Sequence, residues 1–103
     1  MQSIHIGRDC MLSYGIEIRT GDSHSIIQND TNERINFSNS IEIGNHCWIC
    51  AKATILKGVN IKDNCIIGNG CIVTKSFNQS NCIISGIPGK IVKENINWSR
   101  EKL

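Results

Sequence analysis

Aliphatic side chains recur at every sixth position along much of the chain. One series lies upstream and a longer one follows it: Ile6, Leu12 and Ile18, then Ile43, Ile49, Ile55, Ile61, Ile67 and Val73. A second small or apolar residue stands two positions earlier in most repeats. A helix would repeat at three and four residues, and hairpins would place turns at irregular intervals. A fixed period of six instead predicts an all-β fold, a parallel β-helix of hexapeptide repeats.

Stacking in such a coil follows directly from the period. Three hexapeptides make one triangular turn of about 18 residues, and alternate side chains of each strand face inwards. Glycine, asparagine and aspartate between the strands supply the corner conformations. Residues one turn apart should therefore lie on top of one another, which predicts three stacked pairs: Ile43 with Ile61, Ile49 with Ile67, and Ile55 with Val73.

Length and charge limit what such a coil can be. With 103 residues, the chain is expected to form a single domain, residues 1–103. A net charge of +2 is too small to indicate a nucleic-acid partner. The sequence has no long apolar run and no leader-like segment, so we expect no membrane span and a cytoplasmic location. The repeats begin at Ile4 without a cap, which predicts either a shortened coil or an end covered by a partner subunit.

Six cysteines raise the question of a metal or redox site. Cys10, Cys47, Cys65 and Cys71 fall at inward positions, where a free cysteine packs as a small apolar side chain. Cys47 and Cys50 have the spacing of half a zinc site or of a redox pair, but only Cys47 should face inwards. A disulfide between Cys47 and Cys65 is within geometric reach, yet it is not expected in the cytosol. We expect no metal.

The repeat is interrupted once, after Ile18. The next inward positions hold Asp22 and His24, and a polar stretch over residues 28–40 follows before the period resumes. Local rules that fail inside a consistent pattern are expected at functional sites. A solvent-exposed loop with an incidental histidine explains the same pattern. The residues alone therefore leave two interpretations of residues 23–42, an active-site loop or a connection.

Motifs around this interruption resemble those of the hexapeptide acetyltransferases. They are Asp22-Ser23-His24, Ile41-x-Ile43-Gly44-x-x-Cys47-Trp48-Ile49, Gly68-Asn69-Gly70 and Gly86-Ile87-Pro88-Gly89-Lys90. The most similar branch contains maltose, galactoside and nodulation-factor O-acetyltransferases, with many that act on capsule or lipopolysaccharide. The resemblance covers residues 4–93. It implies a left-handed coil with one protruding loop and a short C-terminal capping segment over residues 94–103, in which Trp98 is expected to pack on the last coil.

The resemblance implies transfer of an acetyl group from acetyl-CoA to a hydroxyl of a sugar or cell-surface polysaccharide. An alcohol attacks poorly until its proton is removed, and an imidazole can remove it near neutral pH. By resemblance, His24 is this general base. Asp22, Glu33 or a main-chain carbonyl could orient its ring. The oxyanion needs preorganised donors, for which backbone N–H groups near Trp48 or Ala51 are candidates.

Further positions are implied for acetyl-CoA, which is expected to lie along the stacked coils between the subunits of a homotrimer. Trp48 should line this cleft, unless it serves only as a subunit contact. Backbone at Ala51 and Asn69 should bind the pantetheine amides. Cations suit the nucleotide phosphates, although each could also be a solvated surface charge. The residues matching that end are Thr74, Lys75, Lys90 and Lys93.

Alternative functions remain at this stage. The chain departs from the family pattern at Cys50, Asn69 and Gly89, and it is short. It could thus be a truncated, non-catalytic β-helix scaffold that at most binds CoA. A zinc enzyme of the γ-carbonic-anhydrase type would need three clustered histidines, and the spacing of the chain's three histidines does not resemble that set. Serine acetyltransferases lack this arrangement of loop and tryptophan.

Overall fold

Three narrow sheets surround a solid interior. Between residues 2 and 103, the part of the chain that this computed structural model describes, there are eleven strands and no helix. The first sheet comprises β1 (Ile4–Ile6), β4 (Ile41–Ile43) and β7 (Asn60–Ile61). The second comprises β2 (Met11–Leu12), β5 (Trp48–Ile49), β8 (Ile66–Ile67), β10 (Cys82–Ser85) and β11 (Lys90–Glu94). The third comprises β3 (Glu17–Ile18), β6 (Thr54–Ile55) and β9 (Ile72–Val73).

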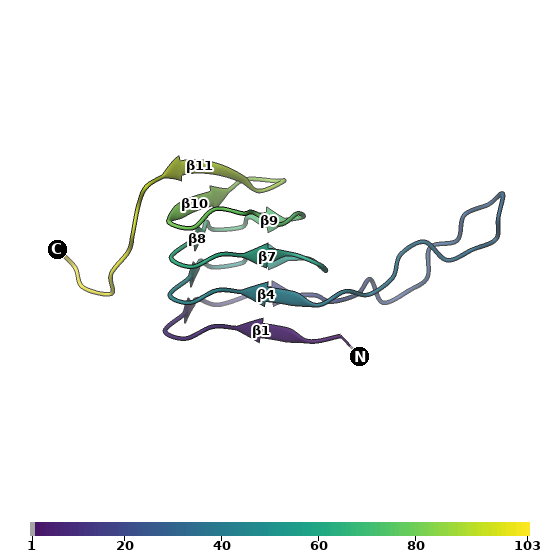
Figure 1. Cartoon of the computed structure of the whole chain (residues 1–103), viewed down its shortest axis with the longest axis horizontal. Coiled ribbons are helices and arrows are strands. Elements are labelled where there is room, and N and C mark those ends of the chain that lie inside the picture. Colours follow the sequence, from purple (N-terminus) through teal and green to yellow (C-terminus); the bar gives the residue numbers. More distant parts are fainter. Residues whose placement is uncertain (1) are drawn as a thin grey trace.

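Strands stack upon one another from the N-terminal end to the C-terminal end (Figure 1). All strand pairs are parallel except the pair formed by β10 and β11. The predicted parallel β-helix is therefore confirmed. The three predicted stacks are confirmed as well, because the ladders pair Ile43 with Ile61, Ile49 with Ile67, and Ile55 with Val73.

The interior is a column of isoleucine, valine and cysteine. Ile49, Ile55 and Ile67 are fully buried, as a period of six requires. Cys47, Cys65, Cys71 and Cys82 fill the smaller inward positions and are also fully buried. All six cysteines are free thiols, and burial raises the pKa of Cys47 to about 12. The Cys47 thiol therefore stays protonated at neutral pH, and the buried cysteines act as packing groups.

The observed contact between thiols is not the Cys47–Cys65 pair that was considered from the sequence. The two thiols in contact are those of Cys65 and Cys82, whose Sγ atoms lie 3.7 Å apart. Cys47 instead directs its thiol to the carbonyl of Lys62 at 3.1 Å. Cys10 is only partly buried.

The first coil is open to solvent on one side. Ile4, Ile6 and Leu12 face the interior, but 44%, 40% and 43% of their surfaces remain exposed because no strand lies beneath them. Among residues 2–103, strand β1 pairs only with β4, so its other edge has no strand partner there.

An excursion of the chain interrupts the ladder without shifting it. Ile6 pairs with Ile43 and Ile43 with Ile61, so the first step up the coil takes 37 residues and the next takes 18. The additional residues form a long loop that projects from the coil (Figure 1). The N–H of Asn39 donates to the carbonyl of Thr20 at 2.9 Å, which closes the base of the loop.

Candidate active site

Asn36 is the centre of a polar network at the base of the loop. It is the one polar residue buried among residues 2–103, with 6% of its surface exposed. Its amide nitrogen donates to Asp22 Oδ2 at 3.0 Å and to the carbonyl oxygen of His24 at 2.7 Å. Its amide oxygen accepts from the N–H of Ile26 at 2.7 Å and from Nε of Arg34 at 3.2 Å. The Asn36 side chain thereby joins the outgoing and returning segments of the loop.

Asp22 holds this network to the coil. Its Oδ2 lies 2.6 Å from Nζ of Lys57, which stands on the next coil. The bonds from Lys57 and Asn36 lower the pKa of Asp22 below its ordinary value. The contribution of the Asp22 carboxylate to the stability of the network is therefore fully present above pH 3.8. It is lost as the pH falls through the lowered pKa of Asp22.

His24 has a fixed backbone and a free ring. Its N–H donates to the carbonyl of Asp22 at 2.8 Å, and its own carbonyl is held by Asn36. Ser23, immediately before it, has a φ of 70°, which turns the chain sharply at this point. The side chain is exposed, and no hydrogen bond to its ring occurs within the part of the chain that the structure describes. An exposed imidazole without a partner is available to a substrate.

Asp22 reaches His24 through Asn36 and the backbone. Its carboxylate bonds Lys57 and Asn36, and no contact with the imidazole is formed. Asp22 was one of three candidates for orienting the ring, and the left-handed Ser23 between the two residues breaks the strand geometry that would place both side chains on one face. Asn36 was not assigned a role from the sequence, where an asparagine in a polar loop looks unremarkable.

We expect Asn36→Ala to release the loop. The substitution removes the acceptor of the part-buried Ile26 N–H and one of the two donors to Asp22, which keeps Lys57, and each lost hydrogen bond costs about 0.5–1.5 kcal/mol locally. Hydrogen exchange at the Ile26 amide is the measurement, and its protection should be lost. Asn29→Ala is the matched control, because Asn29 lies in the same loop and is exposed. Unchanged protection in Asn36→Ala would contradict this role.

Trp48 lies on β5, on the outer surface of the second sheet. It is half-buried, and the ring of Trp98 lies 6.0 Å from it at an interplanar angle of 46°. The backbone N–H of Trp48 donates to the carbonyl of Cys65 at 2.9 Å. Its indole N–H has no protein acceptor within residues 2–103. The indole is thus the donor that Trp48 has available.

Ala51 and Asn69 are brought together by the stacking of two coils. The N–H of Ala51 donates to Oδ1 of Asn69 at 3.1 Å, and its carbonyl accepts from the N–H of Gly70 at 2.9 Å. Both backbone groups of Ala51 are therefore bonded within the chain. The amide nitrogen of the exposed Asn69 remains available to a ligand.

Four further candidates lie at the C-terminal end of the coil (Figure 1). Thr74 and Lys75 directly follow β9, and Lys90 and Lys93 are on β11. All four are exposed. Nζ of Lys75 lies 5.6 Å from the ring centroid of Phe77, so one cation is held near the surface by an aromatic ring.

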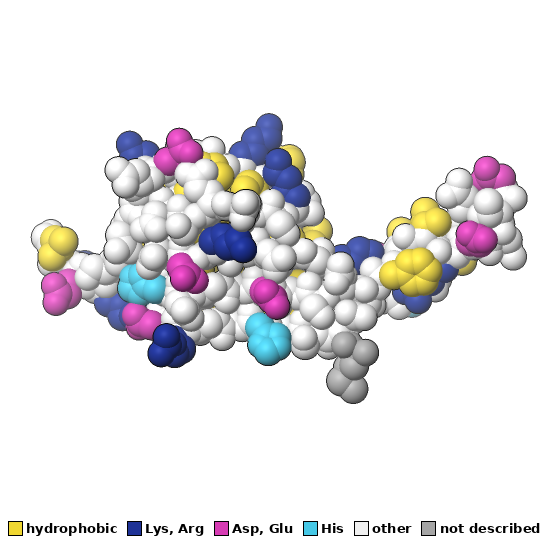
Figure 2. All heavy atoms as spheres, viewed as in Figure 1, with side chains coloured by type: hydrophobic (Ala, Val, Ile, Leu, Met, Phe, Trp, Pro, Cys, Tyr) yellow, Lys and Arg dark blue, Asp and Glu magenta, His cyan; other side chains and the backbone are white. Residues whose placement is uncertain are grey.

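One chain does not bring the proposed base and the proposed cleft together. His24 stands at the base of the loop, between β3 of the third sheet and β4 of the first. Trp48 is on the second sheet, beside the C-terminal segment. The loop and that segment leave the coil in opposite directions (Figure 1), and Figure 2 shows apolar side chains on the projecting loop. These exposed loop residues are Ile26, Ile27, Ile35 and Phe37.

Residues 2–103 contain neither a metal-binding cluster nor a membrane-spanning helix. No group of three or more histidine, cysteine, aspartate or glutamate side chains there could hold a metal ion. No helix that could cross a membrane is found in the same residues.

Comparison with known proteins defines the class of the chain. Residues 40–75 match the family described as bacterial transferase hexapeptide (six repeats). The chain resembles the hexapeptide-repeat O-acetyltransferases, and the predicted resemblance is confirmed. The similar solved structures are left-handed coils of this kind, which confirms the predicted handedness.

Particular relatives are more informative than the class. The chain is 50% identical over 95% of its length to a polysialic acid O-acetyltransferase of Neisseria meningitidis, of which it covers 46%. It superposes on the structure of the polysialic acid O-acetyltransferase OatWY with a TM-score of 0.94 and 49% identity, covering 97% of this chain and 47% of that one. A galactoside acetyltransferase in complex with coenzyme A gives a TM-score of 0.75 at 29% identity, covering 88% and 44% of the two chains. The chain spans about half the length of these relatives.

Proposed function

We propose that the chain is the hexapeptide coil of an O-acetyltransferase that moves an acetyl group from acetyl-CoA to a hydroxyl of a cell-surface polysaccharide, with a polysialic acid as the acceptor. The observation that carries this proposal is the match, over nearly the whole chain, to polysialic acid O-acetyltransferases. The exposed and anchored His24 supports it, because acetyl transfer to an alcohol needs a base at the surface of the coil.

Chemistry at this site follows from the available groups. His24 accepts the proton of the acceptor hydroxyl while the oxygen attacks the thioester carbon. The tetrahedral intermediate then collapses, the C–S bond breaks, and the proton passes from His24 to the departing thiolate as free CoA forms. The indole N–H of Trp48 is the donor suited to the developing oxyanion, since the backbone N–H groups of Trp48 and Ala51 are already bonded.

The donor substrate is assigned to the outer surface of the stacked coils. Trp48 lines its acyl end, and Asn69 offers its amide nitrogen to the pantetheine carbonyls beside Ala51. Positive charge suits the phosphates of the nucleotide. The cations and the adjacent hydroxyl that we assign to it are Lys75, Lys90, Lys93 and Thr74.

A complete site requires a second protomer in this proposal. His24 and Trp48 lie on different sheets of one chain, so a homotrimer would set the loop of one protomer against β5 of the next. The exposed apolar side chains of the loop support such a contact. A cytoplasmic location agrees with six free thiols.

Binding of the donor can be tested by thermal unfolding with CoA. At a CoA concentration of about 100 times the dissociation constant, the free energy of unfolding should rise by about 2.7 kcal/mol. A variant with Lys75, Lys90 and Lys93 all changed to Gln should need a higher CoA concentration for the same shift. Lys62→Gln is the matched control, because Lys62 is exposed and directly follows β7.

A turnover assay distinguishes an active enzyme from the alternative, a non-catalytic scaffold. Release of free CoA thiol is measured with and without polysialic acid, and acceptor-dependent release is expected. A thermal shift without such release would favour a non-catalytic scaffold that binds CoA. If CoA caused no thermal shift and no CoA were released, both the enzymatic function and the CoA-binding scaffold would be overturned.

A further inference from the structure

The C-terminal segment docks on the second coil, at a distance from the last coil. After β11, residues 95–103 descend along the outside of the coil (Figure 1). Trp98, with 8% of its surface exposed, stacks on the ring of His46 with centroids 4.0 Å apart and an interplanar angle of 11°. Its indole N–H donates to the carbonyl of His46 at 2.7 Å. The expectation that Trp98 packs on the last coil was wrong, because its partners lie at the corner between β4 and β5.

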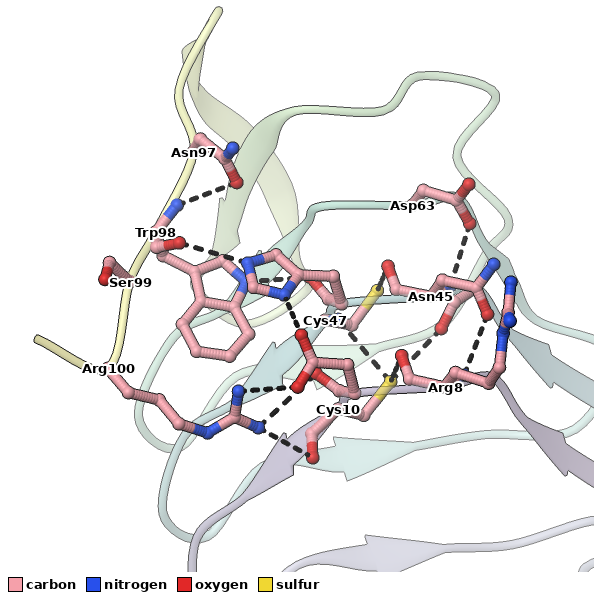
Figure 3. A network of polar contacts seen from close by, with 12 residues as sticks. Arg8, Cys10, Asn45, Cys47, Asp63, Asn97, Trp98, Ser99 and Arg100 are labelled. Atoms are coloured by element: carbon pink, nitrogen blue, oxygen red, sulfur yellow. Dashed lines mark hydrogen bonds and ion pairs between the residues drawn. The ribbon is translucent and has the colours of Figure 1, made fainter.

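His46 is bonded at both ring nitrogens to hydrogen-bond acceptors. Its ring belongs to the polar network around Trp98 and Arg100 (Figure 3). Nδ1 lies 2.8 Å from Oδ2 of Asp9, and Nε2 lies 3.0 Å from the carbonyl oxygen of Trp98. A neutral imidazole has one N–H and would satisfy only one of these acceptors. The imidazolium has two and satisfies both. The geometry therefore selects the protonated ring when the segment is docked.

Charged groups around His46 come from two other elements. Asp9, between β1 and β2, supplies the carboxylate, and Arg100 of the C-terminal segment donates to Oδ1 of the same carboxylate at 2.7 Å. The guanidinium of Arg100 also lies 5.0 Å from the ring centroid of Trp98. The carbonyl of Trp98 and the carboxylate of Asp9 raise the pKa of His46, and Arg100 opposes them only weakly. Cys47, next along the chain, points into the interior and stays protonated.

We infer that His46 is a positioning residue whose protonated ring clamps residues 97–100 to the second coil and thereby fixes Trp98 against Trp48. The clamp comprises the two bonds of the His46 ring, the indole bond of Trp98, the bonds of Arg100 to Asp9 and one ring stack. Trp98 in turn contacts Trp48 at 6.0 Å. The position of Trp48 thus depends on whether the segment is docked.

This arrangement makes docking depend on pH with a definite sign. Because the pKa of His46 is raised by docking, protonation stabilises the docked segment fully below pH 6.5. That contribution is lost as the pH rises through the raised pKa of His46. The segment should therefore be held tightly in mildly acidic solution and loosened in mildly alkaline solution.

Nuclear magnetic resonance tests the clamp without any ligand. The ring protons of His46 and the indole N–H of Trp98 are followed from about pH 5.5 to about pH 9. Both should titrate with one midpoint above 6.5. In His46→Gln the Trp98 signal should stay constant across this range. In Asp9→Asn, where the carboxylate is lost, the midpoint should fall.

Two results would overturn the clamp. One is a Trp98 signal that stays constant while His46 titrates in the unmodified chain. The other is an unchanged midpoint in Asp9→Asn, which keeps the test decisive if His46→Gln does not fold. His5→Gln is the matched control and should behave as the unmodified chain, because His5 is exposed on β1.

The effect on Trp48 rests on the proposed function and has its own measurement. Calorimetry should show CoA binding several-fold weaker in His46→Gln than in the unmodified chain near pH 6, with the two affinities converging near pH 9. Equal affinity at the lower pH would show that the segment does not position Trp48. Absence of CoA binding in both chains would overturn the proposed function and leave the ligand-free titration unaffected.

Discussion

Replacement of His24 by alanine is expected to lower kcat for acetyl transfer by about 10²- to 10⁴-fold, the usual contribution of a general base. The imidazole ring makes no hydrogen bond within residues 2–103, so its removal should leave the fold and the loop network unchanged. The dissociation constant for CoA should change little, because we assign the donor to Trp48 and the lysines.

The measurement is CoA release in the presence of a saturating acceptor, with calorimetry of CoA binding on the same preparations. His5→Ala is the matched control, since His5 is also exposed but lies on β1, away from the loop. Equal turnover in His24→Ala and the unmodified chain would remove His24 from the chemistry. Parallel losses in both variants would indicate damage to the coil.

The second large effect concerns the stack formed by Leu12, Ile49 and Ile67. Ile49→Ala removes a fully buried side chain from the middle of this stack and should lower the free energy of unfolding by about 2–5 kcal/mol. Leu12→Ala should cost clearly less, because 43% of Leu12 is exposed and the site can relax into solvent. Chemical denaturation of the two variants measures both values.

Leu12 serves as an internal control for the state of the first coil. The two side chains have similar size and lie in adjacent layers of one sheet. A cost for Leu12→Ala as large as that for Ile49→Ala would mean that another surface covers the first coil in solution. A small cost for Ile49→Ala would contradict the packed interior.

Repetition explains why much of the fold could be predicted. Once the period of six is recognised, Ile43 must lie on Ile61 and Ile55 on Val73, since equal steps of 18 residues bring them into register. Each layer repeats the previous one, so local pattern and tertiary contact carry the same information. The step from Ile66 to Ile83 takes only 17 residues, and nothing in the apolar pattern marks the missing residue.

The candidate site was less predictable because its contacts are not periodic. Asn36 works by lying between Asp22 and the carbonyl of His24, which are brought to it by the return path of the loop. The docking of Trp98 on His46 spans 52 residues and depends on how far the segment descends. The sequence around Trp98 does not predict which coil its side chain will pack against. The role of His24 itself remains a proposal that the experiments above address.

The closure between Thr20 and Asn39 has a consequence for how this scaffold changes over evolutionary time. The excursion departs and returns at one corner, and the layers above and below keep their register. Insertions, deletions or wholesale exchange of the hairpin can therefore accumulate there without disturbing the prism. The residues of the loop and those that stabilise the coil are thereby encoded in separable parts of the gene, so the loop can diversify on an unaltered frame.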